Sequence, residues 1–170
     1  PLKNMFKKIT KIIKNRNVSK TKLKPIDCLD IANIIGENVV SGGVRRTAEI
    51  ILGDANDDEF IKAKNDIYKQ VDGEWIANEE LSHIKVSNNS IFYKEKPTRE
   101  KMYWQIDQMR RTGEPGFINA EAAKKRKEDF EGVNPCGEIL LDDKGMCNLT
   151  TVVVDKFVEN GEVKEKELLY

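Results

Sequence analysis

Two thiols and a carboxylate in the last quarter of the sequence have the types and spacing of a redox site. Cys136 and Glu138 lie two residues apart in the segment Asn134-Pro135-Cys136-Gly137-Glu138, and Cys147 follows eleven residues after Cys136. A cysteine between proline and glycine is expected in a turn, where its side chain faces a cavity and not the interior of a helix. If the loop is extended there, alternate residues share a face, so Asn134 and Glu138 are expected in the same cavity.

A thiol, a carboxylate and an amide together suit a polyhydroxylated substrate. One group attacks, one moves a proton, and one orients hydroxyl groups by hydrogen bonds. The same five residues also fit a Pro-Gly turn that carries an inert, buried cysteine and a solvent-exposed glutamate. The motif alone leaves both interpretations open.

Two further segments could bind a ligand. Gly42-Gly43-Val44-Arg45-Arg46 has two glycines that allow a backbone to approach a ring closely, and two arginines that can bind phosphate. A glycine pair that ends a helix, followed by solvated arginines, is the alternative. Ser87-Asn88-Asn89-Ser90 offers four small polar residues after a short predicted strand, suited to phosphate or ribose, and a plain Asn-Asn turn is the alternative there.

Hydrophobic periodicity predicts the elements that must position these segments. Helices are expected in residues 6–13, 25–39, 58–68, 98–111 and 120–127, with a buried stripe of Leu29, Ala32, Ile35 and Val39 in the second and Thr98 as the cap of the fourth. Strands are expected at 48–52, 75–76, 84–86, 91–93, 117–118 and 150–154. Strands separated by helices favour an α/β class with a parallel sheet or a barrel sector. Trp75 and Trp104 are expected in the core.

Composition excludes several classes of protein. The chain has 170 residues, 39% of them apolar, which is enough for one core. With 29 basic and 29 acidic residues, no net charge attracts it to nucleic acid or to an anionic membrane. No membrane span or signal peptide is recognised, so a cytoplasmic location is the default and the three cysteines are expected to be reduced thiols.

The remaining residues with chemical potential are interpreted as structural. Cys28 lies in a predicted helical stripe and is expected to be a buried, inert thiol. His83 is the single histidine and is expected to be structural or solvent-facing. No Cys/His group has zinc spacing, so no metal site is predicted.

Five motifs, taken together, resemble the catalytic subunits of ribonucleotide reductases, and most closely the adenosylcobalamin-dependent class II type. They occur in the family's order: Gly42 to Arg46, Ser87 to Ser90, Gly113-Glu114-Pro115-Gly116, Asn134 to Ile139, and Cys147-Asn148-Leu149. The resemblance covers the chain from Pro25 to about Leu149. The eleven-residue gap between Cys136 and Cys147 favours class II over the metal-radical type, and Glu138 argues against a glycyl-radical type.

The resemblance implies a role for each residue of the Cys136 segment. Cys136 becomes a thiyl radical that abstracts the 3′ hydrogen of the ribose, and Glu138 deprotonates the 3′ hydroxyl. Asn134 holds the sugar hydroxyls. Cys147 is one thiol of the pair that reduces the substrate and ends as a disulfide, which a thioredoxin-like reductant resets. The partner of Cys147 is not evident, because the family takes it from an upstream strand.

The resemblance also implies a fold and ligands. Residues 25–170 would form a partial sector of the ten-stranded reductase barrel, with a helical lead-in at 1–24 and a central finger loop at 133–140. Ser87, Asn88, Asn89 and Ser90 would lie near the ribonucleotide substrate. Ser41 to Arg46, within a specificity loop at 41–47, would lie between the substrate and a deoxynucleotide effector. Gly42-Gly43 differs from the commoner Gly-Asn, so effector preference does not carry over.

Family members are several times longer, and the chain begins without methionine, so an internal fragment is expected. The cofactor would be adenosylcobalamin, bound by segments outside this chain, and the isolated chain is expected to be an inactive part of a ribonucleoside di- or triphosphate reductase. The alternative is a catalytically inactive nucleotide-binding or complementing module from a split or intein-interrupted gene. A domain excised from a longer enzyme is also open.

Overall fold

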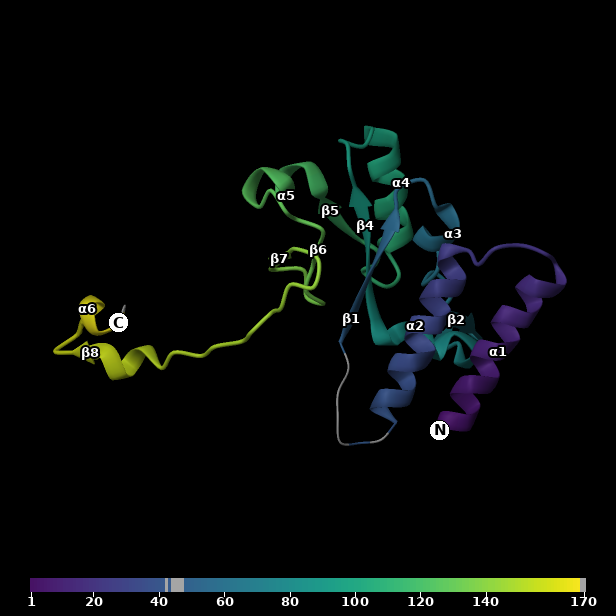
Figure 1. Cartoon of the computed structure of the whole chain (residues 1–170), viewed down its shortest axis with the longest axis horizontal. Helices are drawn as coiled ribbons and strands as arrows, with labels where there is room; N and C mark the ends of the chain where they lie inside the picture. The colour runs from purple at the N-terminus through teal and green to yellow at the C-terminus, as the bar shows by residue number, and fades with distance from the viewer. Residues whose placement is uncertain (42, 44–47, 169–170) are drawn as a thin grey trace.

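The computed structural model describes residues 1–41, 43 and 48–168, and its centre is a three-stranded parallel sheet (Figure 1). The strand order is β1 (Glu49–Asp54), β4 (Ser87–Tyr93) and β5 (Gly116–Asn119), with Glu49 opposite Ser87 and Ser90 opposite Gly116. The α/β class with parallel strands is therefore confirmed. Within the described part of the chain the sheet does not close into a barrel.

Helices cover one face of this sheet. They are α2 (Pro25–Val40), α3 (Asp58–Ile61) and α4 (Arg99–Met109), and α1 (Leu2–Val18) packs on the outside of α2 (Figure 1). The core on this side joins helices to strands through the buried side chains of Leu29, Phe60, Ile61, Ile84, Ile91 and Tyr93. Pro25 begins α2 at a first-turn position, and the Thr98 side chain caps α4 by accepting from the Lys101 backbone N–H, both as predicted.

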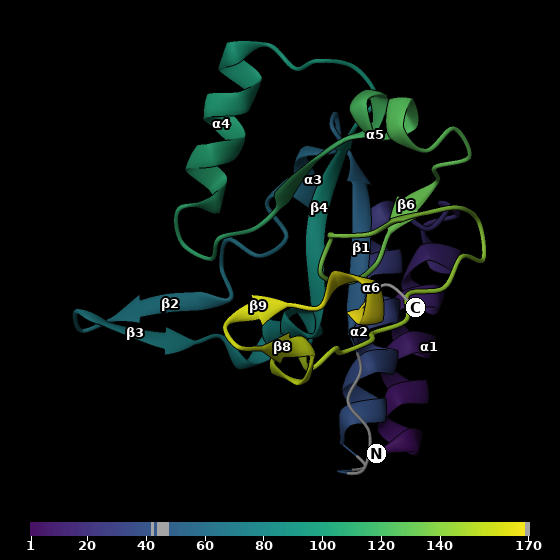
Figure 2. The same cartoon turned by 90° about the vertical axis from the view of Figure 1, so that its left-hand side faces the viewer.

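The opposite face of the sheet carries α5 (Ala120–Arg126) and a short hairpin of β6 (Gly132–Val133) and β7 (Leu140–Leu141) (Figure 2). Phe130 is fully buried there and stacks on Phe92 of β4, with 5.7 Å between ring centroids. Side chains from all three strands complete this second cluster, among them Leu52 and Ile118. The segment with Cys136 is therefore held against the sheet at its two ends.

Of the remaining elements in the described residues, only the 3-10 helix η1 (Glu79–Val86) contributes a buried residue to the main core, which is Ile84. β2 (Tyr68–Val71) and β3 (Glu74–Ala77) form an antiparallel hairpin, and η1 leads into β4. After residue 145 the chain runs away from the sheet to η2 (Val154–Phe157), β8 (Val158–Glu159), β9 (Glu162–Val163) and α6 (Glu165–Leu168) (Figure 1). No helix in the described ranges has the length and apolar character needed to cross a bilayer.

Several predicted elements were wrong. The helix expected at 58–68 ends at Ile61, because the chain turns there to reach the β2 strand. Residues 84–86 belong to η1 and not to a strand. Residues 150–153 are extended but pair with no described strand, so their β-branched side chains have no sheet to join.

Two expectations about burial were also wrong. Trp75 is exposed, because the β2–β3 hairpin stands away from the core, whereas Trp104 packs against the core as expected. Ile35 and Val39 are exposed on α2, because the helix packs on the sheet through Leu29, Asn33 and Gly36 instead.

Candidate functional site

The segment with Cys136 is a closed turn between β6 and β7. The backbone N–H of Asn134 donates to the carbonyl of Ile139 at 3.3 Å, and the Ile139 N–H donates to the Asn134 Oδ1 atom at 3.0 Å. Gly137 donates its N–H to the Asn134 carbonyl at 2.8 Å and has a φ of +82°, which glycine adopts without strain. The Pro-Cys-Gly sequence thus forms the turn that its residue types predict.

The shape of this turn corrects the expectation that Asn134, Cys136 and Glu138 share one face. Residues 135–137 turn back on themselves, so the alternation of an extended strand does not apply. Asn134 is buried, with 4% of its surface exposed, while Cys136 and Glu138 are exposed. The thiol and the carboxylate are therefore on the surface, whereas the Asn134 amide is buried and contacts the Ile139 N–H and the Cys147 sulfur.

Cys147 comes close to this turn through Asn134. The Asn134 Nδ2 atom lies 3.6 Å from the Cys147 Sγ atom, within hydrogen-bonding distance for sulfur. All three cysteines are exposed free thiols. The structure therefore places the Cys147 thiol against Asn134, two residues before Cys136.

Ser87, Asn88, Asn89 and Ser90 lie in strand β4, where the sequence predicted a segment that follows a strand. The side chains of Ser87, Asn89 and Ser90 are buried, and the Ser87 hydroxyl lies 2.8 Å from the Asn89 Oδ1 atom. Asn88 is exposed, and its Nδ2 atom donates to the carbonyl of Pro135 at 2.7 Å. This contact joins the two candidate segments directly.

The predicted specificity loop is described only in part. Ser41 follows the C-terminal end of α2, and its hydroxyl donates to the Asn38 carbonyl at 2.8 Å. Gly43 has a φ of +72°. Gly42, Val44, Arg45 and Arg46 lie outside the described residues, so their role stays a prediction.

The two residues interpreted as structural differ in outcome. Cys28 is exposed, so the prediction of a buried thiol was wrong; Leu29, the next residue, takes the buried position. His83 is structural, as expected, with its Nε2 atom 3.0 Å from the Asp30 Oδ1 atom. Across the described ranges, no cluster of three or more His, Cys, Asp or Glu side chains could hold a metal ion.

Two buried polar arrangements were not predicted. Lys64 is 3% exposed and forms an ion pair with Glu114. Gln105 is fully buried, donates to the carbonyls of Pro115 and Gly116 at 3.1 Å, and accepts from the Tyr93 hydroxyl at 2.5 Å. Burial raises the pKa of that hydroxyl. Just one part of these arrangements was recognisable in the sequence, the motif Gly113 to Gly116, which contains Glu114 and Pro115.

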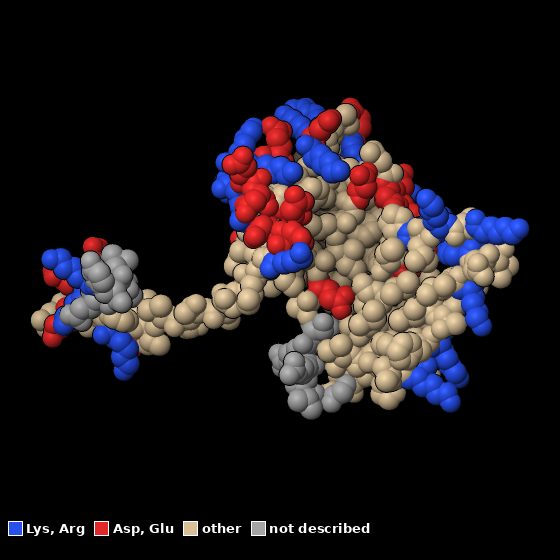
Figure 3. Space-filling view, viewed as in Figure 1, with Lys and Arg blue, Asp and Glu red and all other residues tan. Residues whose placement is uncertain are grey.

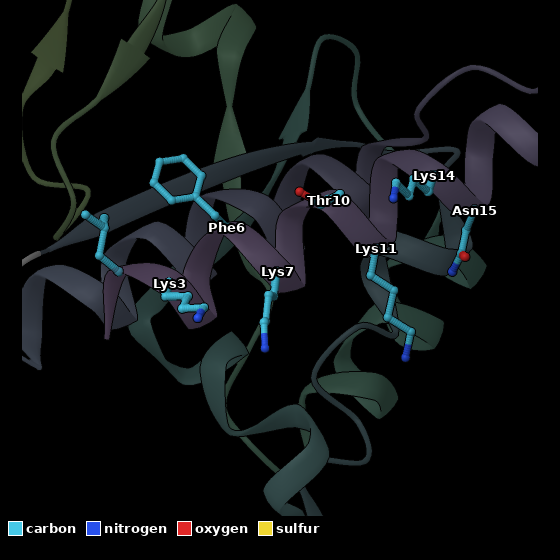
Figure 4. Close-up of a pocket in the computed structure, with 8 residues that line it drawn as sticks. Lys3, Phe6, Lys7, Thr10, Lys11, Lys14 and Asn15 are labelled. Atoms are coloured by element: carbon cyan, nitrogen blue, oxygen red, sulfur yellow. The ribbon is translucent and has the colours of Figure 1, made fainter.

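The best-formed surface grooves lie elsewhere. One runs along α1 and is lined by Leu2, Phe6 and the lysines of one helix face (Figure 4). Others lie beside α1 and α2, beside α4, and at the carboxyl ends of β1 and β4. Cys136, Glu138 and Cys147 line none of these five grooves, and all three residues are exposed.

Comparison with known proteins identifies the class. The chain is similar to adenosylcobalamin-dependent ribonucleotide reductases over about nine tenths of its length, which confirms the resemblance that its motifs indicate. The adenosylcobalamin-dependent ribonucleoside-triphosphate reductase of Lactobacillus acidophilus is 37% identical over 163 residues, and that of Lactobacillus helveticus is 36% identical over 163 residues. The reductase of the same name from Lacticaseibacillus paracasei is 36% identical in an alignment of 173 positions that covers 95% of this chain.

The chain spans about a fifth of the length of these relatives, 20% for the two Lactobacillus enzymes and 21% for the Lacticaseibacillus enzyme. No protein-family model matches the chain. No solved structure matches it either.

Proposed function

We propose that this chain is the part of an adenosylcobalamin-dependent ribonucleoside-triphosphate reductase that carries the reacting cysteine. The observation that supports this most is the turn between β6 and β7, where Asn134 contacts both the backbone of the Cys136 loop and the Cys147 thiol. The similarity to reductases of that name supports the substrate class. Because the chain spans a fifth of their length, the activity is proposed for a longer reductase or for an assembly that contains this chain.

In this proposal Cys136, as a thiyl radical, takes the 3′ hydrogen atom of the ribose. Glu138 accepts the proton of the 3′ hydroxyl, which helps the 2′ hydroxyl leave as water with a proton from the thiol pair. Cys147 and a second thiol supply two electrons and end as a disulfide, which a thioredoxin-like reductant reopens by thiol exchange. The exposure of Cys136, Glu138 and Cys147 fits groups that must meet a substrate and a reductant.

We expect the groups that bind adenosylcobalamin in another part of the reductase. When bound there, the cofactor would supply the radical chemistry that activates the Cys136 thiol.

The substrate and effector segments complete the proposal. Asn88 is the exposed member of Ser87 to Ser90 and contacts the Cys136 loop, which supports a role for Asn88 in contacting the ribonucleotide. Residues 41–47 would sense a deoxynucleotide effector, and residues 25–170 would form a sector of the catalytic barrel after a helical lead-in at 1–24. A cytoplasmic location goes with this role.

A segment exchange tests this function. The homologous part of the Lactobacillus acidophilus reductase is replaced by this chain, and formation of deoxynucleotide from a ribonucleoside triphosphate is measured with adenosylcobalamin and a thiol reductant. We expect the exchanged enzyme to form product, and Glu138→Gln in it to lower the rate by about 10²- to 10⁴-fold, because the amide cannot accept the 3′ proton. Glu131→Gln, also exposed and close in sequence, is the matched control. An unchanged rate in Glu138→Gln contradicts the proton-transfer role.

A further inference from the structure

An ion pair between the buried Lys64 side chain and the partly exposed Glu114 side chain holds strand β4 and has no part in the chemistry proposed above. The Lys64 Nζ atom lies 2.7 Å from the Glu114 Oε2 atom, and the Lys64 side chain is 4% exposed. Burying a charge is costly unless the charge is paired and hydrogen-bonded, and replacing such a pair by apolar residues often leaves stability unchanged or improved. A pair in this position therefore suggests a role in fixing geometry.

Both members of the pair bind the backbone of strand β4. The Lys64 ammonium donates to the carbonyl of Ser87, and the Glu114 Oε2 atom accepts the N–H of Asn89 at 2.7 Å. The N–H of Ser87 donates to the Oδ1 atom of Asn33 at 2.9 Å. Pairing of β4 with β5 starts only at Ser90, opposite Gly116. The backbone groups of Ser87 and Asn89 therefore bind side chains. From Ser90 onward, the backbone of β4 binds strand β5 instead.

Asn88 lies between the two residues that the ion pair holds. Successive side chains of a strand point to opposite faces, so Asn88 shares the face of Phe92, which packs against the β6–β7 cluster. From this face its Nδ2 atom reaches the carbonyl of Pro135, the residue before Cys136. Because the backbone is held on both sides of Asn88, the position from which its side chain reaches Pro135 is fixed.

We propose that Lys64 and Glu114 are positioning residues for the Cys136 loop, acting through the β4 backbone and Asn88. An ion pair suits this task because the ammonium has three donors, which reach a carboxylate and a carbonyl at once, and the carboxylate oxygen accepts from both the ammonium and an N–H. The importance of the pair for catalysis rests on the proposed function. The structural link from the pair through β4 and Asn88 to the Cys136 loop is independent of that function.

Amide hydrogen exchange in the 170-residue chain tests the link. The N–H groups of Gly137 and Ile139 close the turn, so their exchange rates report how well the loop is held. We expect Glu114→Leu to raise both rates by about tenfold or more relative to the amides of α4. Glu114→Gln keeps an oxygen that accepts from Lys64 and Asn89, so it should keep both rates within about threefold of the parent.

A double variant separates positioning from stability. Lys64→Met with Glu114→Leu removes both charges and should restore the free energy of unfolding. It still leaves the Ser87 carbonyl and the Asn89 N–H without their side-chain partners, so the Gly137 and Ile139 amides should exchange faster than in the parent. Adding Asn88→Ala should then cause little further increase, because both changes act through one contact.

Loop amides that exchange at the parent rate in the double variant overturn the proposal. So does a rise in step with the α4 amides, because that reports general destabilisation. Additive effects of Asn88→Ala and the double variant also count against it. No nucleotide enters the measurement, so this inference and the reductase function can fail independently.

Discussion

Asn134 uses both ends of its amide to shape the loop that carries Cys136. Its Oδ1 atom accepts the N–H of Ile139 across the turn, and its Nδ2 atom contacts the Cys147 sulfur. In the proposed reductase an amide at this position was expected to hold the ribose hydroxyls. In the structure Asn134 also joins the Cys136 loop to Cys147, and these contacts form without a substrate.

Replacing this residue should therefore be costly. Asn134→Ala leaves the Ile139 N–H of the partly exposed turn without its side-chain partner, which should lower the free energy of unfolding by about 0.5–1.5 kcal/mol. Urea denaturation followed by far-UV circular dichroism measures the change. Asn148→Ala, at an exposed position nearby, is the control and should have little effect. Equal stability of the two variants would show that the loop does not depend on the Asn134 amide.

Single residues also show what the sequence can and cannot predict. Pro135, Cys136 and Gly137 predict their own turn, because backbone preferences are local. Lys64 gave no such signal, because its burial depends on Ser87 and Glu114, which are distant in sequence. Ser87 to Ser90 were expected after a strand because their side chains are polar. They form the strand itself because Asn33, Lys64 and Glu114 satisfy its backbone.

At the level of elements, α2 illustrates how packing decides among possible buried faces. Its sequence has apolar residues on most of its circumference, so periodicity alone favoured the stripe of Ala32, Ile35 and Val39 with Leu29. The buried side of α2 is instead that of Asn33 and Gly36, where a Cβ atom on Gly36 would lie 2.7 Å from the Cγ1 atom of Val86 in η1 and would also meet the Glu49 side chain of β1. The close approach that this glycine permits sets the rotation of the helix and leaves Ile35 exposed.

The contact between α1 and α2 should make stability depend on pH. Arg16 donates from Nε and a terminal nitrogen to the two carboxylate oxygens of Asp27, at 2.7 and 2.9 Å, and this holds the pKa of Asp27 below its ordinary value of 3.8. The Lys24 N–H adds to the effect. Because the folded-state pKa is depressed, this stabilisation is present above the unfolded pKa and is lost as pH falls through the folded one.

We therefore expect the free energy of unfolding to fall more steeply below about pH 4 in the parent chain than in Asp27→Asn. Urea denaturation at a series of pH values from 7 to about 2.5 measures both slopes. Glu37→Gln is the control, since the Lys8–Glu37 pair is exposed and such pairs contribute little. Identical acid slopes in the parent and in Asp27→Asn would contradict the assigned role of this ion pair.

On the scale of the whole molecule, charge and apolar surface are unevenly distributed. The first 24 residues contain nine Lys and Arg and no acidic residue, so the overall neutrality of the chain hides a basic end. Figure 3 shows basic side chains over α1 and a cluster with many acidic ones over α5 and the β6–β7 hairpin. The zero net charge of the chain therefore does not by itself exclude an acidic binding partner at the basic N-terminal helix.

The segment after the Cys136 loop carries exposed apolar residues. Leu149 is 96% exposed, and Val152, Val153 and Val154 are each about half exposed. Exposed apolar stretches of this kind usually contact another protein surface. The sequence predicted a strand at 150–154 because these residues are β-branched, and we expect the strand to form only where the rest of a reductase supplies a neighbour.

The central claim is that Cys136 is the reacting thiol of a ribonucleotide reductase. Its most direct test is the rate of deoxynucleotide formation by the segment-exchanged reductase with Cys136→Ser, compared with the same enzyme with Cys28→Ser, a second exposed cysteine. We expect Cys136→Ser to lose at least about 10³-fold in rate, because a hydroxyl cannot replace the thiol that forms the radical, and Cys28→Ser to keep the parent rate. Turnover by Cys136→Ser at the rate of Cys28→Ser would contradict the claim.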